Sequence, residues 1–259
     1  MKIGIFDSGI GGLSVLPAAR RALPHSDLLY YADELHVPYG EKTPKEILEY
    51  SMAAVDFLVS IGAKAIVVAC NTATSVAVNA LREKYESPDI NIPIIGMEPA
   101  VKRALDTCPE GRILVAATPV TVKGQKLKLL VDRYDTNKVT DAIPMPLLVR
   151  LAEAECFGTT EADEYIKKEL SRFDMSKYSA LVLGCTHFNY FKDSFRRILP
   201  SHVSIVDGVD GTVRRLVSRL PFTEGGSTSA EFFTSGKTSE NKEKFLRLLS
   251  RLEKMEEIN

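Results

Sequence analysis

The sequence predicts an α/β fold built from two similar, pseudo-symmetric lobes, each a mostly parallel sheet flanked by helices. Short apolar segments alternate with longer amphipathic ones, which is the rhythm of βαβ units. Residues 65–70 and 180–185 are continuous apolar runs, typical of strands that are covered on both faces of a sheet. The hydropathy pattern of the first segment then returns near residue 112. These observations favour two α/β halves with the active site in the cleft between them.

The first half is expected to contain four strands separated by helices. The strands are residues 3–8, 27–33, 65–70 and 92–97, and the helices are residues 12–23, 43–62 and 73–85. Thr43 is a natural N-cap, Pro44 suits the first helical position, and Gly62 is a natural stop. Pro17 is expected to make the helix 12–23 irregular. Parallel strands joined in this way are expected to have right-handed crossovers.

The second half repeats this order. We expect strands at 112–118, 180–185 and 203–208, helices near 121–132, 160–172 and 191–200, and a largely apolar segment at 138–149. Duplication would divide the halves near residues 97 and 206, although a generic buried-strand pattern would explain the same similarity. We therefore expect a first lobe of residues 1–97 plus 207–259 and a second lobe of residues 98–206.

The last part of the chain is expected to complete the first lobe. Residues 224–240 are polar and rich in turn-forming residues around a strand at 230–234. The tail after them places five apolar residues on one helical face, which predicts a packing helix. These residues are Phe245, Leu248, Leu249, Leu252 and Met255.

Composition excludes several classes of protein. The 259 residues include 33 basic and 34 acidic residues, so the net charge of −1 gives no electrostatic footprint for nucleic acid. Apolar runs are too short for a membrane span, and the N-terminus enters a strand without a signal-peptide pattern. Four cysteines in such a chain do not suggest a disulfide framework. We expect a protein of the reducing cytoplasm.

Two cysteines end buried strands in the same way, Cys70 in "AIVVACNTAT" and Cys185 in "ALVLGCTHFN". In open parallel sheets, ligands collect beyond the carboxyl ends of the strands, and Asp7 occupies a third such end. Two thiols on opposite sides of a ligand suit one reaction: one removes a proton from a carbon and the other returns a proton to the opposite face. A thiol with a pKa near ~8.5 is a thiolate to a few per cent at neutral pH.

The residues beside these cysteines fit a small anionic ligand. Asn71 and Thr72, like Thr186 and His187, follow their cysteine into a helix N-terminus, where backbone N–H groups bind carboxylates. The glycine-rich "DSGIGG" at residues 7–12 offers Ser8 as a donor, but it is not a G-x-G-x-x-G dinucleotide motif. The loop "VPYG" at residues 37–40 can bring Tyr39 and backbone amides to a ligand.

In this order and at these spacings, "DSGIGG", "VPYG", "ACNTAT" and "GCTHF" resemble the glutamate racemases of the aspartate/glutamate racemase superfamily. The resemblance runs from Lys2 to about Gly208. It implies racemisation of L-glutamate to D-glutamate for peptidoglycan synthesis, without a cofactor or a metal, by proton transfer at the α-carbon between two thiols. It also implies a cytoplasmic homodimer.

Carried over to this chain, the resemblance assigns Cys70 and Cys185 as catalytic thiols, with Cys185 deprotonating L-glutamate and Cys70 deprotonating D-glutamate. Asp7 and His187 match acid/base helpers, and Glu153 matches a third. The substrate-binding positions would be Asp7, Ser8, Tyr39, Gly40, Asn71, Thr72, Thr118, Thr186 and His187. Two positions depart from the family pattern: His36 stands where an arginine is common, and "RLAEAE" leaves the choice between Glu153 and Glu155 open.

Each of these residues also has a simpler explanation. The cysteines could be packing residues, Asp7 only a helix N-cap, and His187 a surface histidine. Cys70, Cys185 and His187 have ligand types suited to zinc, but they lack the usual spacing. The same residues would also suit a hydrolase with one nucleophilic cysteine, a racemase of aspartate or another amino acid, or a binding protein without activity. Cys108 and Cys156 are expected to be structural or incidental, and His25, His36 and His202 suggest no chemistry.

Overall fold

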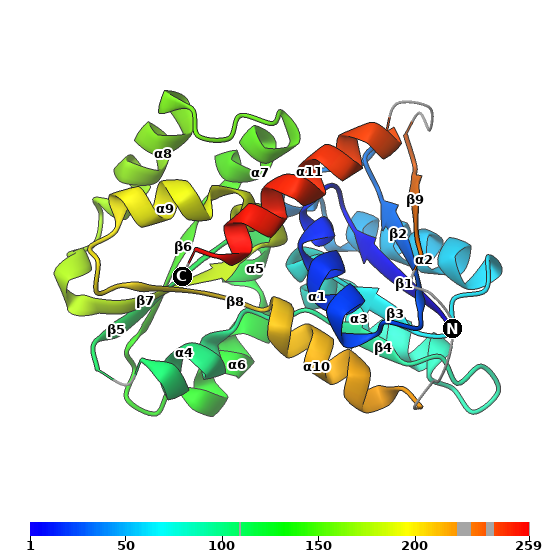
Figure 1. Cartoon of the computed structure of the whole chain (residues 1–259). Coiled ribbons are helices and arrows are strands. Elements are labelled where there is room, and N and C mark those ends of the chain that lie inside the picture. The colour runs from blue at the N-terminus through cyan, green and yellow to red at the C-terminus, as the bar shows by residue number, and fades with distance from the viewer. Residues whose placement is uncertain (109, 222–228, 237–240, 259) are drawn as a thin grey trace.

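A computed structural model describes residues 1–108, 110–221, 229–236 and 241–258. Within these residues two parallel sheets lie side by side, each flanked by helices (Figure 1). The first sheet has the order β4-β3-β1-β2-β9 and contains β1 (Lys2–Asp7), β2 (Asp27–Ala32), β3 (Ile66–Val68), β4 (Ile94–Gly96) and β9 (Ala230–Thr234). The second has the order β6-β5-β7-β8 and contains β5 (Arg112–Ala117), β6 (Thr140–Pro144), β7 (Tyr178–Gly184) and β8 (Ser204–Asp207). The prediction of a two-lobed α/β fold is confirmed.

The two sheets share one topology. Read from one edge, β4-β3-β1-β2 in the first sheet matches β8-β7-β5-β6 in the second, and every pair is parallel. The strands that precede Cys70 and Cys185 therefore occupy equivalent positions, as predicted. The strand expected at residues 230–234 is β9, which extends only the first sheet by pairing with β2. Of the polar stretch at 224–240, residues 224–228 and 237–240 lie outside the described residues.

In the first lobe the chain forms helices α1 (Val15–Ala22), α2 (Pro44–Ser60) and α3 (Asn71–Tyr85), with 3₁₀ helices η1 (Gly11–Ser14) and η2 (Tyr39–Glu41). Thr43 caps α2 in a reciprocal capping box with Glu46, as the sequence predicted. The helix expected at 12–23 is irregular, because it is divided into the 3₁₀ helix η1 and the α-helix α1. Since α1 begins at Val15, Pro17 lies in its first turn, where a missing N–H costs nothing.

The second lobe differs from its prediction in the lengths of its helices. The elements are α4 (Val101–Thr107), α5 (Pro119–Lys123), α6 (Gln125–Tyr134), α7 (Pro146–Glu153), α8 (Thr160–Leu170), η3 (Met175–Lys177), η4 (Thr186–Phe191) and α9 (Lys192–Ile198). Helix α10 (Val209–Arg219) follows β8 and packs on the first lobe. The single helix expected near residues 121–132 is two helices, α5 and α6, separated at Gly124. The largely apolar segment at 138–149 forms β6 and the start of α7. Helices α4 and α10 were not predicted; α4 is too short to show a clear period.

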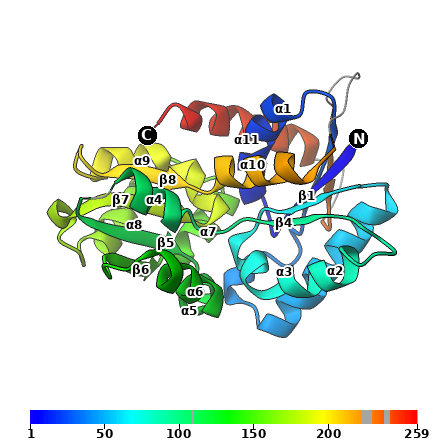
Figure 2. The same ribbon diagram turned by 90° about the horizontal axis from the view of Figure 1, so that it is seen from below.

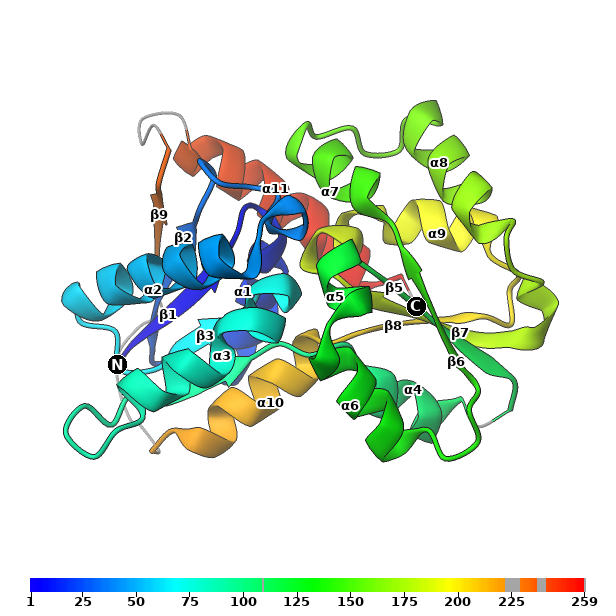
Figure 3. The ribbon, with the colours of Figure 1, turned by 180° about the vertical axis from the view of Figure 1, so that it is seen from behind.

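The C-terminal helix α11 (Asn241–Glu256) runs across the boundary between the lobes (Figure 1). Its five predicted apolar residues are buried, and the helix contacts η1, η4 and β9. Helix α10 contacts α1 and β4 and lies between them in Figure 2. At the back of the molecule, α5 of the second lobe contacts α3 and η2 of the first (Figure 3). Contacts made by α11, α10 and α5 therefore hold the two lobes together at their boundary.

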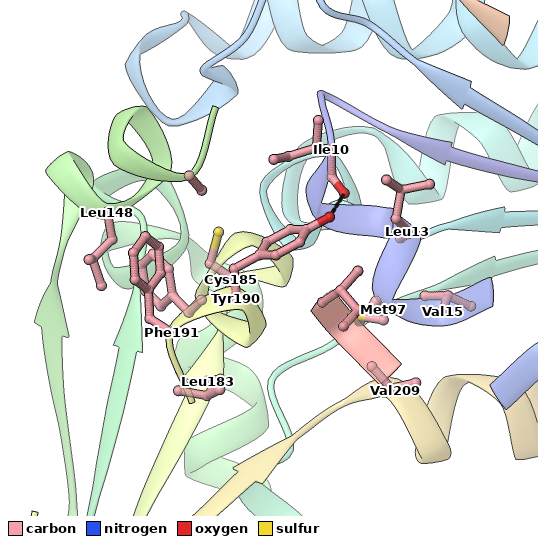
Figure 4. Packing of buried hydrophobic residues seen from close by; sticks show 14 of the residues in the cluster. Ile10, Leu13, Val15, Met97, Leu148, Leu183, Cys185, Tyr190, Phe191 and Val209 are labelled. Atoms are coloured by element: carbon pink, nitrogen blue, oxygen red, sulfur yellow. Dashed lines mark hydrogen bonds between the residues drawn. The ribbon is translucent and has the colours of Figure 1, made fainter. Parts of the chain in front are cut away.

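A single apolar cluster also crosses this boundary (Figure 4). Ile10 and Leu13 of the first lobe belong to the same cluster as Leu148 and Phe191 of the second. At about 25 cal/mol per Å² of buried apolar surface, such a shared core favours the closed arrangement of the lobes. This packing brings the carboxyl ends of the strands in the two sheets close to the boundary between the lobes.

Candidate active site

The carboxyl ends of equivalent strands meet at this boundary. Asp7 ends β1 and Thr118 follows β5, while Cys70 and Cys185 follow β3 and β7. All four side chains are buried, with exposed fractions of 0% for Asp7, 5% for Cys70 and 6% for Cys185. The cleft predicted between the lobes is thus a closed interior in this structure, lined by the residues that the sequence singled out.

Asp7 reaches from the first lobe to the second. Its carboxylate accepts hydrogen bonds from the Thr186 hydroxyl at 3.0 Å and from the Gly9 N–H at 2.9 Å. Burial raises the pKa of Asp7, and the nearby charge of His187 opposes this shift. The interpretation of Asp7 as only an N-cap is wrong, because η1 begins after Ile10.

A line of three polar groups lies on the side of Cys185. The Cys185 sulfur is 3.9 Å from His187 Nδ1, and His187 Nε2 is 2.6 Å from Glu153 Oε1. Burial alone would lower the pKa of His187, but its hydrogen bonds to Cys185 and Glu153, together with their charges, raise it well above its usual value. Burial raises the pKa of Glu153, yet its bond to His187 brings it below the ordinary range. His187 and Glu153 therefore form an ion pair in which His187 is buried, at 1% exposure, and the Glu153 side chain is 17% exposed. His187 is thus not a surface histidine.

Cys70 has different surroundings. It is the N-cap of α3, where its sulfur accepts from the Ala73 N–H at 3.4 Å and donates to the Ser8 hydroxyl at 3.5 Å. Burial raises the pKa of Cys70 to about 12, and the charges of Asp7 and Cys185 add to the effect. Ser8, which contacts the Cys70 sulfur, follows Asp7, and Asp7 accepts a hydrogen bond from Thr186, the residue after Cys185.

The remaining predicted positions come from three loops. Thr72 and Thr118 join the lobes through a 2.8 Å hydrogen bond between their hydroxyls. A Cβ at Gly40 would lie 2.9 Å from the Cβ of Thr118, so the "VPYG" loop packs directly on that threonine. Asn71 Oδ1 is buried without a hydrogen-bond partner among the described residues. The Tyr39 hydroxyl already donates to Asp33 at 2.6 Å. The backbone of this loop is therefore the part that can still bind a ligand.

The glycines of "DSGIGG" make the contact between the lobes possible. A Cβ at Gly9 would overlap Glu153 Oε1, and a Cβ at Gly11 would overlap Thr186 Oγ1 and lie 2.5 Å from His187 Nδ1. Because glycine has no Cβ at these two positions, the second lobe comes close enough for the Ile10 N–H to donate to Glu153 at 2.9 Å. These two glycines therefore serve close approach to the second lobe.

Sequence reasoning missed the groups that hold these loops. The buried carboxylate of Asp33 accepts from Tyr39, from the Ser235 hydroxyl at 2.6 Å and from His36 Nδ1 at 2.8 Å. His36 also stacks on Tyr50 with ring centroids 3.7 Å apart. The available signal was the position of Asp33 directly after β2, because ligands in such sheets bind beyond the carboxyl ends of the strands.

Two tyrosines fix the backbone of the glycine-rich loop. The Tyr30 hydroxyl donates to the Gly9 carbonyl at 2.6 Å, and the Tyr190 hydroxyl donates to the Ile10 carbonyl at 3.0 Å. Figure 4 shows Tyr190 reaching Ile10 from η4, with Cys185 close beside it. No pattern in the sequence distinguishes these tyrosines from ordinary core residues.

Residues that the sequence left as alternatives lie in different surroundings. Glu155 forms a surface ion pair with Arg247 at 2.8 Å, whereas Glu153 contacts His187. Cys108 and Cys156 are partly exposed and contact none of the predicted site residues in the described chain.

Across the described ranges, no three His, Cys, Asp or Glu side chains are grouped as a metal would require. Nor does any helix described here have the length and apolar character to span a membrane.

The chain belongs to the Asp/Glu/Hydantoin racemase family, whose sequence profile it matches over residues 14–216. Within that family it is similar to glutamate racemases. The enzyme of Campylobacter curvus (strain 525.92) is 52% identical over 270 residues, with all of both chains covered. The glutamate racemase of Lachnospira eligens is 47% identical, also with both chains covered completely.

Solved structures of glutamate racemases have the same fold. A Bacillus anthracis isoform is 28% identical with a TM-score of 0.86, covering 96% of this chain and 93% of that one. The Escherichia coli enzyme, solved with L-glutamate and the activator UDP-MurNAc-ala, is 32% identical with a TM-score of 0.83, covering 97% and 94%. The resemblance inferred from the four motifs is confirmed.

Proposed function

We propose that this protein interconverts L- and D-glutamate without a cofactor and so supplies D-glutamate for peptidoglycan. The observation that carries the proposal is the pair of buried cysteines at equivalent strand ends of two matching lobes. One stereocentre held between two such thiols can lose a proton on one face and gain one on the other. Relatives named glutamate racemase at 52% and 47% identity support glutamate as the substrate.

In the direction from L- to D-glutamate, Cys185 acts as the base. The imidazolium of His187, 3.9 Å from the sulfur, stabilises a thiolate there, and Glu153 keeps His187 charged and oriented. The thiolate takes the α-proton, and the neutral thiol of Cys70 delivers its own proton to the opposite face. The reaction leaves Cys185 protonated and Cys70 as a thiolate, which is the starting state for the reverse direction.

Cys70 is suited to hold a proton until it is needed. Because burial raises its pKa to about 12, Cys70 is a thiol at neutral pH. Asp7, whose pKa is also raised, lies close enough for its charge to act on Cys70 and is the candidate for assisting its proton transfer. The reverse reaction depends on this side of the site.

Substrate binding is assigned to the hydroxyl, amide and backbone groups around the sulfurs. Ser8, Asn71 and Thr72 would hold the ligand from the first lobe, with the backbone at residues 39–40. Thr118, Thr186 and His187 would hold it from the second lobe. Fixed donors in a dry site stabilise the negative charge that develops when the weakly acidic α-proton leaves.

The lobes must separate for glutamate to enter, because the site is closed. The contacts to be broken include the hydrogen bond between Thr72 and Thr118 and the surface ion pair between Arg150 and Glu41. Closure then excludes water before proton transfer. The moving units proposed are residues 1–97 plus 207–259 and residues 98–206. A cytoplasmic homodimer remains part of the same proposal.

The direct test is to mix purified protein with L-glutamate and no added cofactor, and to follow circular dichroism. The signal should decay to zero, and D-glutamate should approach the same end point from the opposite sign. L-aspartate should react far more slowly, because donors placed for the γ-carboxylate would be left unpaired. Equal kcat/KM values for both amino acids would indicate a sister racemase, and activity lost to a chelator and restored by zinc would support a zinc enzyme instead.

A further inference from the structure

The peptide group between Gly9 and Ile10 is held on both sides by side chains from different lobes. Its carbonyl accepts a hydrogen bond from the hydroxyl of Tyr30, in β2 of the first lobe, at 2.6 Å. Its N–H donates to Glu153 Oε1, in α7 of the second lobe, at 2.9 Å. The C=O and N–H of a planar trans peptide point in opposite directions. A hydroxyl that fixes the carbonyl therefore also fixes the direction in which the N–H points.

The carboxylate oxygen that receives this N–H is the one that pairs with His187. Glu153 Oε1 lies 2.6 Å from His187 Nε2, and His187 Nδ1 lies 3.9 Å from the Cys185 sulfur. A continuous line of contacts thus runs from Tyr30 to a proposed catalytic thiol. A hydrogen bond to a carbonyl also polarises the peptide, which strengthens the bond that its N–H donates by about 10–30%.

The ring of Tyr30 is packed so that its hydroxyl keeps this position. The residue is fully buried, and its ring lies edge-on to Phe245 of α11, with centroids 5.8 Å apart, and to Phe232 of β9, with centroids 6.4 Å apart. Tyr30 is not among the groups assigned to substrate binding. Its effect on the reaction must therefore pass through the peptide that it holds.

We propose that Tyr30 is a positioning residue for Glu153: its hydroxyl fixes the Gly9–Ile10 peptide so that the Ile10 N–H stabilises the Glu153 carboxylate when the lobes are closed. The hydrogen bond between Ile10 and Glu153 joins the lobes, so their separation breaks it. Closure therefore completes the ion pair beside Cys185 in the same step that excludes water. The consequence for racemisation rests on the proposed function.

The protonation of Glu153 is the property that Tyr30 should change. Burial raises the pKa of Glu153, while the bonds from His187 and from the Ile10 N–H bring it below its usual range. A weaker bond from Ile10 stabilises the charged form less, so the pKa of Glu153 should rise when the Tyr30 hydroxyl is removed. The charged or titratable groups that face Glu153 are His187, Asp7, Lys244, Tyr30 and Tyr190.

Tyr190 provides the matched control. It is as fully buried as Tyr30, and it donates to the Ile10 carbonyl at 3.0 Å. That carbonyl belongs to the next peptide along the chain, which does not contain the Ile10 N–H, and it also accepts from the Leu13 N–H at 3.2 Å. Tyr30→Phe and Tyr190→Phe therefore each remove one buried hydroxyl from the same loop. The first variant alone releases the peptide that donates to Glu153.

The test follows the Nε2–H signal of His187 by NMR, in protein with isotope-labelled histidine, as pH is lowered. The signal changes when Glu153 is protonated, and Glu153→Gln, in which this change is absent, assigns it. In Tyr30→Phe the midpoint should rise by about 0.3 to 1 pH unit, the effect of weakening one hydrogen bond to a carboxylate. In Tyr190→Phe the midpoint should stay at the wild-type value. Equal shifts in the two variants, or no shift in Tyr30→Phe, would overturn the proposal.

A second measurement needs no variant. In the wild type the amide signal of Ile10 should shift with the same midpoint, because that N–H donates to the titrating carboxylate; an amide that does not respond would also overturn the proposal.

The effect on racemisation is measured separately, as the acid limb of the pH profile of kcat/KM for L-glutamate. This limb should move to higher pH in Tyr30→Phe by the amount seen in NMR, and it should not move in Tyr190→Phe. A limb that stays in place would refute the consequence for catalysis. The NMR titration needs no turnover, so a wild type without racemase activity would refute the proposed function and leave the position of Glu153 tested on its own.

Discussion

The two sides of the active site are alike in topology and different in electrostatics. Cys70 and Cys185 follow equivalent strands, but Cys70 contacts a hydroxyl and a backbone N–H, whereas Cys185 lies beside the ion pair of His187 and Glu153. A repeated fold therefore places the two sulfurs, and the groups around them differ. In the proposed mechanism this difference makes Cys70 the proton donor and Cys185 the base when L-glutamate is the substrate.

The largest expected effect comes from removing either sulfur. Cys70→Ala and Cys185→Ala should each reduce racemisation by about 10³-fold or more, in both directions, because racemisation needs one thiol to remove a proton and the other to deliver one. Circular dichroism with L- and D-glutamate measures this. Cys156→Ala, at a partly exposed thiol outside the site, should retain wild-type rates. A Cys70 variant that kept near-normal activity would remove the symmetry on which the comparison depends.

The next effect separates the two sides. Glu153→Gln keeps the size of the side chain but removes the charge that holds His187 protonated, so kcat/KM for L-glutamate should fall about 10²-fold. Elimination from a D-configured glutamate analogue with a leaving group on its β-carbon, which depends on Cys70, should change much less. Glu155→Gln is the control, because that carboxylate pairs with Arg247 on the surface. Equal losses in the two variants would contradict the role given to Glu153.

Contact between the lobes can be tested at a glycine. In Gly11→Ala the new methyl group would overlap Thr186 Oγ1 on the opposite lobe, which should cost about 3 kcal/mol of stability and impair closure. Gly211→Ala is the matched control, since a Cβ there meets nothing within 4 Å and the residue is helical. Urea unfolding of both variants gives the comparison. A Gly11 variant as stable and active as the control would show that the lobes need not approach so closely.

The smallest effect is the pH dependence of the buried ion pair. The raised pKa of His187 adds stability that is complete below pH 6.5 and is lost as pH rises through that raised value. The lowered pKa of Glu153 adds stability that is complete above pH 4.5 and is lost as pH falls through the lowered value. The difference in unfolding free energy between wild type and Glu153→Gln should therefore be greatest between pH 4.5 and 6.5, at about 1–2 kcal/mol. A difference that does not vary with pH would mean that the pair is not ionised.

The parts of this structure that the sequence predicted are those encoded by local pattern. Buried apolar runs predicted the strands before both cysteines, and one apolar face predicted the packing of α11. Contacts between distant segments could not be read in the same way. Glu153 and Glu155 are two positions apart, and only the turn after α7, where Glu155 has a φ of 55°, sends one carboxylate to His187 and the other to the surface.

The same limit applies to groups that act by supporting others. The tyrosines that fix the glycine-rich loop, Tyr30 and Tyr190, come from different lobes and look like core residues in the sequence. Motifs therefore identified the reacting groups, and tertiary structure was needed to find what positions them.

The central claim, one base on each face, is tested most directly with a glutamate analogue that carries a leaving group on its β-carbon. Elimination requires only that the α-proton be removed, so it needs one base and not two. Rates would be measured for Cys185→Ala and Cys70→Ala on both enantiomers. Cys185→Ala should lose elimination from the L-configured analogue and keep it on the D-configured one, and Cys70→Ala should do the reverse. If either variant lost both enantiomers equally, that cysteine would have a structural role and the account of two opposed bases would be wrong.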